Sequence, residues 1–252
     1  MKFLFIYSYD GSEFCGSQRQ PHKNSVENYL QEALCHVGIF DKVVSSSRTD
    51  KGVHALNQCS AVSCKNDYFN DKKRLCELIN RHLHPKMHIK KIILVDDNFN
   101  VRFDAIARSY RYVINHSEFS PFLSKYCHFM PKFDIEKLND ILQVFVGEHD
   151  FKNYMKTGSD AKSSVRTVYF ARVFRKDNLS IITFKANGFL RSQIRLMLSN
   201  SFKALNDGKI IENSYKLQAY TRIPFSPNGL YLNKIFYNNF LNKSFFTDID
   251  IN

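Results

Sequence analysis

The chain has 252 residues, 44% hydrophobic and 24% charged, and its 36 Lys and Arg against 24 Asp and Glu give a net charge of +12. This composition excludes an intrinsically disordered chain and supplies a core for one large or two smaller domains. The longest apolar run, residues 3–7, is too short for a membrane-spanning helix or a secretory signal, so we expect a cytoplasmic protein with no membrane partner. The positive charge favours a polyanionic partner, although a solvated lysine-rich surface gives the same excess.

The N-terminal part of the chain mixes strand and helix patterns. Apolar alternation predicts strands over residues 3–9, 58–63 and 89–95, and helical spacing predicts helices over 26–37 and 71–82. Asn24, three residues before Glu27, has the position of a helix N-cap, and Gly38 can end the same helix.

The remainder of the chain continues this mixture. We expect strands over 109–115, 165–174, 179–185 and 230–236, a helix capped by Asp134, and a helix over 189–205. The hairpin-like strand pairs predict an α+β fold with a largely antiparallel sheet, not a doubly wound parallel one. Two similar halves, residues 1–105 and 106–252, fit this pattern.

A polar loop over residues 45–55 carries the most informative cluster. Arg48 and Lys51 flank Asp50 and would keep its carboxylate ionised, ready as a nucleophile or as a counter-charge to a developing cation. Gly52 permits an unusual backbone angle beside it. The alternative is an ordinary Asp-x-Gly turn with solvated charges.

The segment Arg48-Thr49-Asp50-Lys51-Gly52-Val53-His54 resembles the active-site motif of the bacterial tRNA pseudouridine synthases that act on the anticodon arm. Other blocks are similar to those of this family and follow in its order over nearly the whole chain. They are residues 9–20, 102–112, 147–151, 185–195 and 229–232.

The resemblance implies a fold and an activity. The fold is that of pseudouridine synthases, with two similar α+β halves sharing a largely antiparallel central sheet beside a basic cleft. The first half would carry the Asp loop, and the second the active-site Tyr and a late Arg helix. The activity is isomerisation of uridine to pseudouridine at positions 38, 39 and 40 of tRNA, without a cofactor, by a homodimer that grips the anticodon arm.

The resemblance also assigns roles to single residues. Asp50 falls on the catalytic nucleophile. Tyr110 falls on the tyrosine that stacks on the detached uracil and whose hydroxyl can accept the C5 proton; otherwise it is a strand tyrosine packed in the sheet. Arg195 matches the arginine that pairs with the nucleophile, unless it forms a solvated basic stripe with Arg191 on one helix face. Arg48 is implied to help extrude the target uridine, or else to clamp a phosphate.

Basic and aromatic residues interleave between residues 154 and 176, as on an RNA-facing surface or on the polar side of amphipathic strands. The sequence departs from the family pattern at Ser17, Lys51 and His84, which bears on tRNA contacts more than on chemistry. His82 and His84 form an H-x-H pair without a third zinc ligand, and the six scattered cysteines are expected to be reduced, structural thiols.

Two other classes of function are compatible with parts of the sequence. One is a non-catalytic RNA-binding protein on the same scaffold, against which the intact Arg48, Asp50, Tyr110 and Arg195 argue. The other is a metal-free hydrolase using Asp50 with His54 as base, for which no second acid is positioned.

Overall fold

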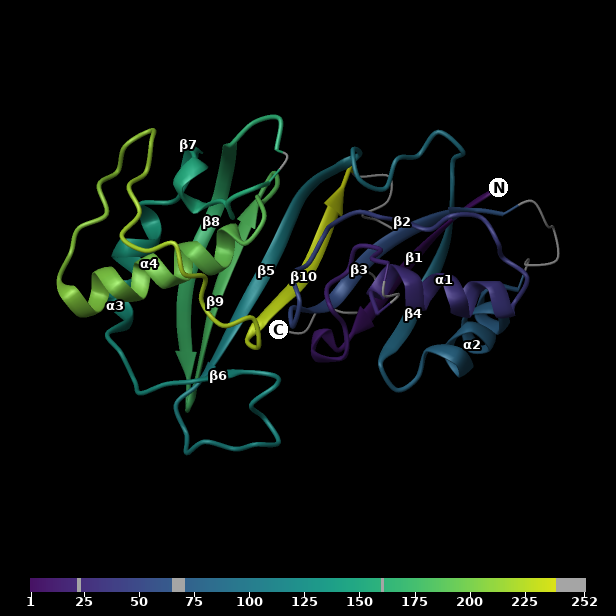
Figure 1. Cartoon of the computed structure of the whole chain (residues 1–252), viewed down its shortest axis with the longest axis horizontal. Helices are drawn as coiled ribbons and strands as arrows, with labels where there is room; N and C mark the ends of the chain where they lie inside the picture. The colour runs from purple at the N-terminus through teal and green to yellow at the C-terminus, as the bar shows by residue number, and fades with distance from the viewer. Residues whose placement is uncertain (22–23, 65–70, 160, 239–252) are drawn as a thin grey trace. The chain divides into compact units, whose positions relative to one another are not determined.

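The structure is a computed structural model that describes residues 1–21, 24–64, 71–159 and 161–238 (Figure 1). The chain forms two compact units, residues 1–107 together with the chain from Leu232, and residues 108–231. The change from one unit to the other falls inside β5 (Ala105–Asn115) and inside β10 (Leu230–Tyr237). The chain therefore passes from one unit to the other within strands.

The first unit is built on a mostly antiparallel arrangement of strands. β1 (Lys2–Tyr9) lies between β4 (Met87–Val95) and β3 (His54–Ser63), β2 (Val44–Ser45) pairs with β3, and β10 follows β3 in the strand order. The strand β1 is buried along most of its length, because its aromatic and aliphatic residues pack on both faces.

Two helices, α1 (Val26–His36) and α2 (Lys72–Leu83), lie side by side in this unit, and α2 packs on β4. Ser25, not the predicted Asn24, is the N-cap of α1, since its side chain accepts the hydrogen bond of the Asn28 amide. The carbonyl of Asn24 instead accepts the amide of Cys15 at 3.0 Å, which keeps Asn24 outside the helix.

The second unit repeats the same scheme. Antiparallel pairing joins β5 to β9 (Leu179–Ala186), β9 to β8 (Val165–Lys176), and β8 to β7 (Gly147–Asp150), while the short β6 (His128–Phe129) pairs parallel with β5. The helix α3 (Ile135–Gln143), capped by Asp134 as predicted, packs on β8 and on α4 (Gln193–Asp207).

The helix α4 begins four residues later than its apolar pattern predicts. Ser192 has a left-handed backbone with φ of 61°, which no helix can continue through, and the Gln193 side chain accepts the amide of Leu190 at 2.8 Å. Arg191 therefore lies before the helix, so it does not share a helix face with Arg195, and the alternative of a basic stripe formed by these two residues is wrong.

The α+β class and the largely antiparallel pairing are confirmed. The chain from Leu232 belongs to the first unit, whereas the expected second half runs to residue 252. The basic cleft between halves stays a prediction. No helix among the described residues is long and apolar enough to cross a membrane.

Candidate functional site

Asp50 opens a tight turn in the loop between β2 and β3. The amide of Val53 donates to the carbonyl of Asp50 at 3.1 Å, and Gly52, with φ of 80°, occupies the turn position that requires a positive φ. Asp50 is half-buried, whereas Arg48 and Lys51 on either side are exposed. The loop thus presents one carboxylate between two cations, as the sequence indicated.

The residue before Asp50 is held from one side by Ser17. The Thr49 amide donates to the Ser17 hydroxyl at 2.8 Å, and the Ser17 amide donates to the Thr49 carbonyl at 3.1 Å. Tyr9 adds a hydrogen bond of 2.8 Å between its hydroxyl and that of Thr49. Burial raises the pKa of Tyr9 to about 12, so this hydroxyl keeps its proton at physiological pH.

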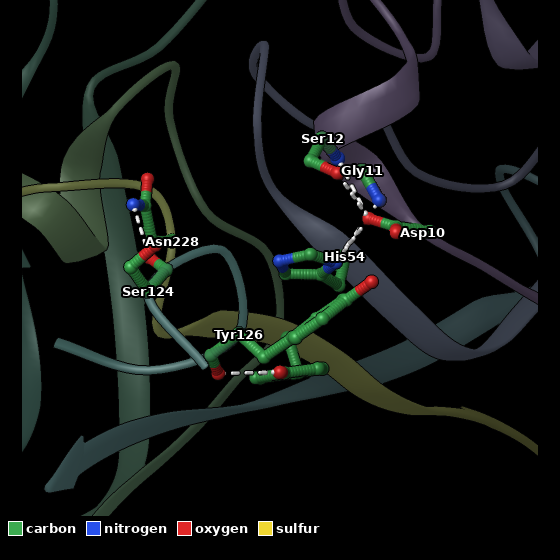
Figure 2. A network of polar contacts seen from close by, with 8 residues as sticks. Asp10, Gly11, Ser12, His54, Ser124, Tyr126 and Asn228 are labelled. Atoms are coloured by element: carbon green, nitrogen blue, oxygen red, sulfur yellow. Dashed lines mark hydrogen bonds and ion pairs between the residues drawn. The ribbon is translucent and has the colours of Figure 1, made fainter. Parts of the chain in front are cut away.

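The other end of the turn rests on Gly11. A Cβ atom at Gly11 would lie 2.1 Å from the Val53 carbonyl oxygen, so only glycine fits there. The Gly11 amide donates to Nδ1 of His54 at 3.0 Å, and the Asp10 carboxylate lies 3.3 Å from the same nitrogen (Figure 2). The N-terminal block therefore contacts the Asp50 loop on both sides of the turn, at Thr49 and at Val53 and His54.

Tyr110 lies in the middle of β5, opposite Phe184 of β9, and only 6% of it is exposed. Its ring meets that of Phe189 edge to face, with centroids 5.3 Å apart. Phe189 belongs to the segment that leads into α4, so the tyrosine is set against the entry of the late helix. This packing suits both readings of Tyr110, a stacking platform and a sheet tyrosine.

Arg195 lies in the first turn of α4 and is tied to the chain that precedes β10. Its Nε donates to the Phe225 carbonyl at 2.7 Å, and the Phe225 amide donates to the Arg195 carbonyl at 3.0 Å. Burial raises the pKa of the nearby Tyr112, and the positive charge of Arg195 opposes this rise. The guanidinium thus has a fixed direction and acts on a poorly solvated neighbourhood.

A basic pair, Arg108 and Arg166, lies close to the same segment and was not singled out from the sequence as a pair. Arg108 donates to the Asn187 carbonyl at 3.0 Å, and Arg166 donates to the Ser163 carbonyl at 3.0 Å. Burial first, and then the charge of Arg108, lower the pKa of Arg166, so the two guanidinium groups lie near each other. Adjacent positive charges of this kind suit an RNA phosphate. The two residues are far apart in the sequence, and only the pairing of β5 and β8 with the two sides of β9 brings their strands near each other.

The four predicted site residues fall into two pairs. Arg48 and Asp50 share the loop of the first unit, and Tyr110 and Arg195 both belong to the second. The predicted ion pair of Asp50 with Arg195 stays a prediction.

The two histidines of the H-x-H pair, His82 and His84, contact different partners. His82 stacks on His36 at 4.6 Å between ring centroids, whereas Nε2 of His84 makes a 2.8 Å hydrogen bond with Nδ1 of His88. Over the described part of the chain, no three His, Cys, Asp or Glu side chains are grouped to hold a metal ion. All six cysteines are free thiols.

Comparison with known proteins gives matches over most of the chain. A family model described as tRNA pseudouridine synthase matches residues 5–104 and 141–238. The chain is 47% identical over 242 residues to "tRNA pseudouridine synthase A" of Campylobacter jejuni (strain RM1221), covering 94% of this chain and 100% of that protein. It is 35% identical over 243 residues to the protein of the same name from Helicobacter hepaticus, covering 92% and 97%.

Among solved structures, a chain of the "Crystal Structure of a Cbf5-Nop10-Gar1 Complex" matches with a TM-score of 0.39 and 12% identity, over 92% of this chain and 49% of that one. The residues matched by the family model include the Asp50 loop and the helix that carries Arg195. The chain belongs to the tRNA pseudouridine synthase family.

Proposed function

We propose that this protein isomerises uridine to pseudouridine at positions 38, 39 and 40 in the anticodon stem-loop of tRNA, with Asp50 as the nucleophile. The observation that carries the proposal is the Asp50 turn, held at Thr49 by Ser17 and at Val53 by Gly11, in a chain of this family. Preorganisation of this kind is what a carboxylate needs in order to meet a ribose carbon in one fixed geometry.

The reaction breaks the N1–C1′ bond of uridine and forms a C5–C1′ bond in its place. The Asp50 carboxylate adds to C1′ or stabilises the oxocarbenium-like or glycal intermediate while the uracil turns. After C5 has bonded to C1′, the C5 proton leaves and N1 gains a proton, so no atom is gained or lost overall. No redox change is involved, so the chemistry requires no cofactor.

The remaining residues bind and orient. The Tyr110 ring stacks on the detached uracil and its hydroxyl accepts the C5 proton. Arg195 holds Asp50 ionised, since a carboxylate that loses solvent without a cationic partner tends to take up a proton. A uridine inside a stem must leave the stack before its C1′ can be reached, and Arg48 supports the extruded nucleotide.

We further propose that the protein works in the cytoplasm as a homodimer whose two subunits grip one tRNA. The net charge of +12 supports an RNA partner, and the Arg108 and Arg166 pair beside the Asn187 segment offers a phosphate contact.

The direct test incubates the purified protein with an unmodified tRNA transcript that carries uridine at position 39, and with a matched transcript that carries cytidine there and purines at 38 and 40. Pseudouridine in the first transcript and none in the second is the expected result. Binding of both transcripts without isomerisation of either would instead identify a non-catalytic RNA-binding protein.

A further inference from the structure

His54 is a buried histidine that the proposed chemistry does not use. It is the first residue of β3, four positions after Asp50, and only 2% of it is exposed. Its Nδ1 accepts the amide hydrogen of Gly11 at 3.0 Å and lies 3.3 Å from Oδ1 of Asp10 (Figure 2). Both contacts converge on one nitrogen atom.

These two contacts require opposite protonation states. A backbone amide only donates, so the Gly11 contact needs a lone pair on Nδ1 and a proton on Nε2. A carboxylate only accepts, so the Asp10 contact becomes a hydrogen bond when Nδ1 carries a proton. Neutral His54 therefore accepts the hydrogen bond of the Gly11 amide. The imidazolium form instead donates a hydrogen bond to Asp10 and loses the bond from the Gly11 amide.

The neutral form of His54, which accepts the Gly11 amide, also holds the Asp50 turn in place. Gly11 lies against the peptide group between Val53 and His54, with the position of a Cβ only 2.3 Å from the Val53 carbonyl carbon. The Val53 amide in turn donates to the Asp50 carbonyl. Through these contacts, a shift of Gly11 away from His54 moves the end of the turn that begins at Asp50.

We propose that neutral His54 is a positioning residue for the isomerisation, which holds the Asp50 turn through the Gly11 amide and releases it on protonation. The inference rests on the proposed function of Asp50. It predicts that kcat falls as pH decreases through the titration of His54, because the imidazolium binds Asp10 instead of Gly11.

Several charged groups lie on the segments that carry this pair or pack against it. Asp10 faces His54 from the end of β1, where its Oδ1 also accepts the amide and the hydroxyl of Ser12. Next to it, Glu13 and Lys86 form an ion pair of 3.7 Å. Arg48 and Lys51 are exposed on the Asp50 loop itself. A proton on Nδ1 of His54 would complete a hydrogen bond to the Asp10 carboxylate.

The test compares His54→Asn with His54→Leu in kcat and KM for tRNA across pH. The Asn side-chain oxygen can accept the Gly11 amide and does not titrate, whereas Leu offers no acceptor. We expect His54→Leu to lower kcat roughly 10- to 100-fold with little change in KM. We expect His54→Asn to keep kcat within about tenfold of wild type near neutral pH and to lose the acidic fall in rate. His36→Asn, an exposed histidine of the same unit, is the matched control and should keep the wild-type profile.

The variant Asp10→Asn provides a second test, in which the acidic fall in rate is moved instead of removed. Asn still accepts the Ser12 amide but no longer stabilises the imidazolium, so the acidic fall in rate should move to lower pH. A wild-type kcat in His54→Leu, or an unchanged acidic fall in rate in His54→Asn, would overturn the inference.

A nitrogen-15 NMR spectrum of the histidine rings separates this inference from the proposed function. The account predicts that Nδ1 of His54 is unprotonated at neutral pH, whether or not the wild-type protein makes pseudouridine. A proton on Nδ1 at neutral pH would overturn the role of His54, whereas an inactive wild type with unprotonated Nδ1 would overturn the proposed function alone.

Discussion

At the scale of single residues, the Asp50 carboxylate is the group on which the proposed chemistry depends. Its turn is short and closed by the Val53 amide, so the backbone that carries the carboxylate is held in one conformation. A flexible loop would spread the carboxylate over many positions, and the loss of orientation alone can cost orders of magnitude in rate.

Replacement of this carboxylate by an amide of the same shape isolates its chemistry. Asp50→Asn should abolish pseudouridine formation and leave the Kd for tRNA within about a few fold of wild type, because one charge changes and little shape does. Single-turnover assays and filter binding measure the two quantities. Comparable turnover by the variant would remove Asp50 from the role of nucleophile.

A variant of Tyr110 separates the role of its ring, which stacks on the uracil, from the role of its hydroxyl, which accepts the C5 proton. Tyr110→Phe keeps the edge-to-face packing on Phe189 but loses the hydroxyl that accepts the C5 proton. The variant should bind tRNA normally and lose about 10²-fold or more in the rate of product formation. A wild-type rate would show that only the ring matters, and Tyr110→Leu should then lose binding of the base as well.

At the scale of elements, the segment after β1 acts as a support for the loop before β3. Gly11, Gly16 and Ser17 each contact the Asp50 loop through the backbone, and a Cβ at Gly16 would lie 3.2 Å from the Thr49 carbonyl oxygen. The contact at Gly11 leaves no room for a side chain, and the positive φ of 108° at Gly16 also favours glycine.

A single added methyl group, in the variant Gly11→Ala, is expected to disrupt this support. Gly11→Ala places its Cβ 2.1 Å from backbone, which cannot move aside as a side chain can, so we expect a loss of more than about 2 kcal/mol in the free energy of unfolding. Gly188→Ala is the matched control, since its Cβ would meet only the Arg166 side chain at 3.7 Å and should change stability by less than about 1 kcal/mol. Urea unfolding of both variants measures the difference, and equal stabilities would contradict the close packing.

The sequence predicts the turn that begins at Asp50, but it does not predict the contacts that hold this turn from other parts of the chain. An Asp-x-Gly spacing is local, and Gly52 indeed takes the positive φ. The bonds from Ser17 to Thr49 and from Gly11 to His54 join residues 32 and 43 positions apart, and no periodicity of the chain encodes such contacts. The late start of α4 was missed for a similar reason, because the left-handed Ser192 interrupts a pattern that remains apolar and helical on both sides.

At the scale of the whole molecule, the chain forms two units and carries a net charge of +12. The family resemblance could be recognised from the sequence because the motifs keep their order, whereas the place of β10 in the strand order could not, since a single late strand gives no signal of which strands it will join.

The positive charge makes a prediction for binding. The log of the tRNA binding constant should fall linearly with the log of salt concentration, with a slope of about −0.7 to −0.9 per phosphate neutralised. Arg108→Gln should reduce the magnitude of that slope by about one, because it removes one phosphate contact. Lys137→Gln, which removes a charge that is 75% exposed on α3, should leave the slope unchanged. A flat salt response in the wild type would contradict an electrostatic grip on tRNA.

The measurement that tests the account most directly is a map of pseudouridine in total tRNA from cells that carry the wild-type gene, no gene, or the Asp50→Asn form. The account predicts pseudouridine at positions 38, 39 and 40 only with the wild-type gene, and uridine at those positions in the other two. Pseudouridine at these positions without the gene, or with the Asn form at wild-type level, would contradict it.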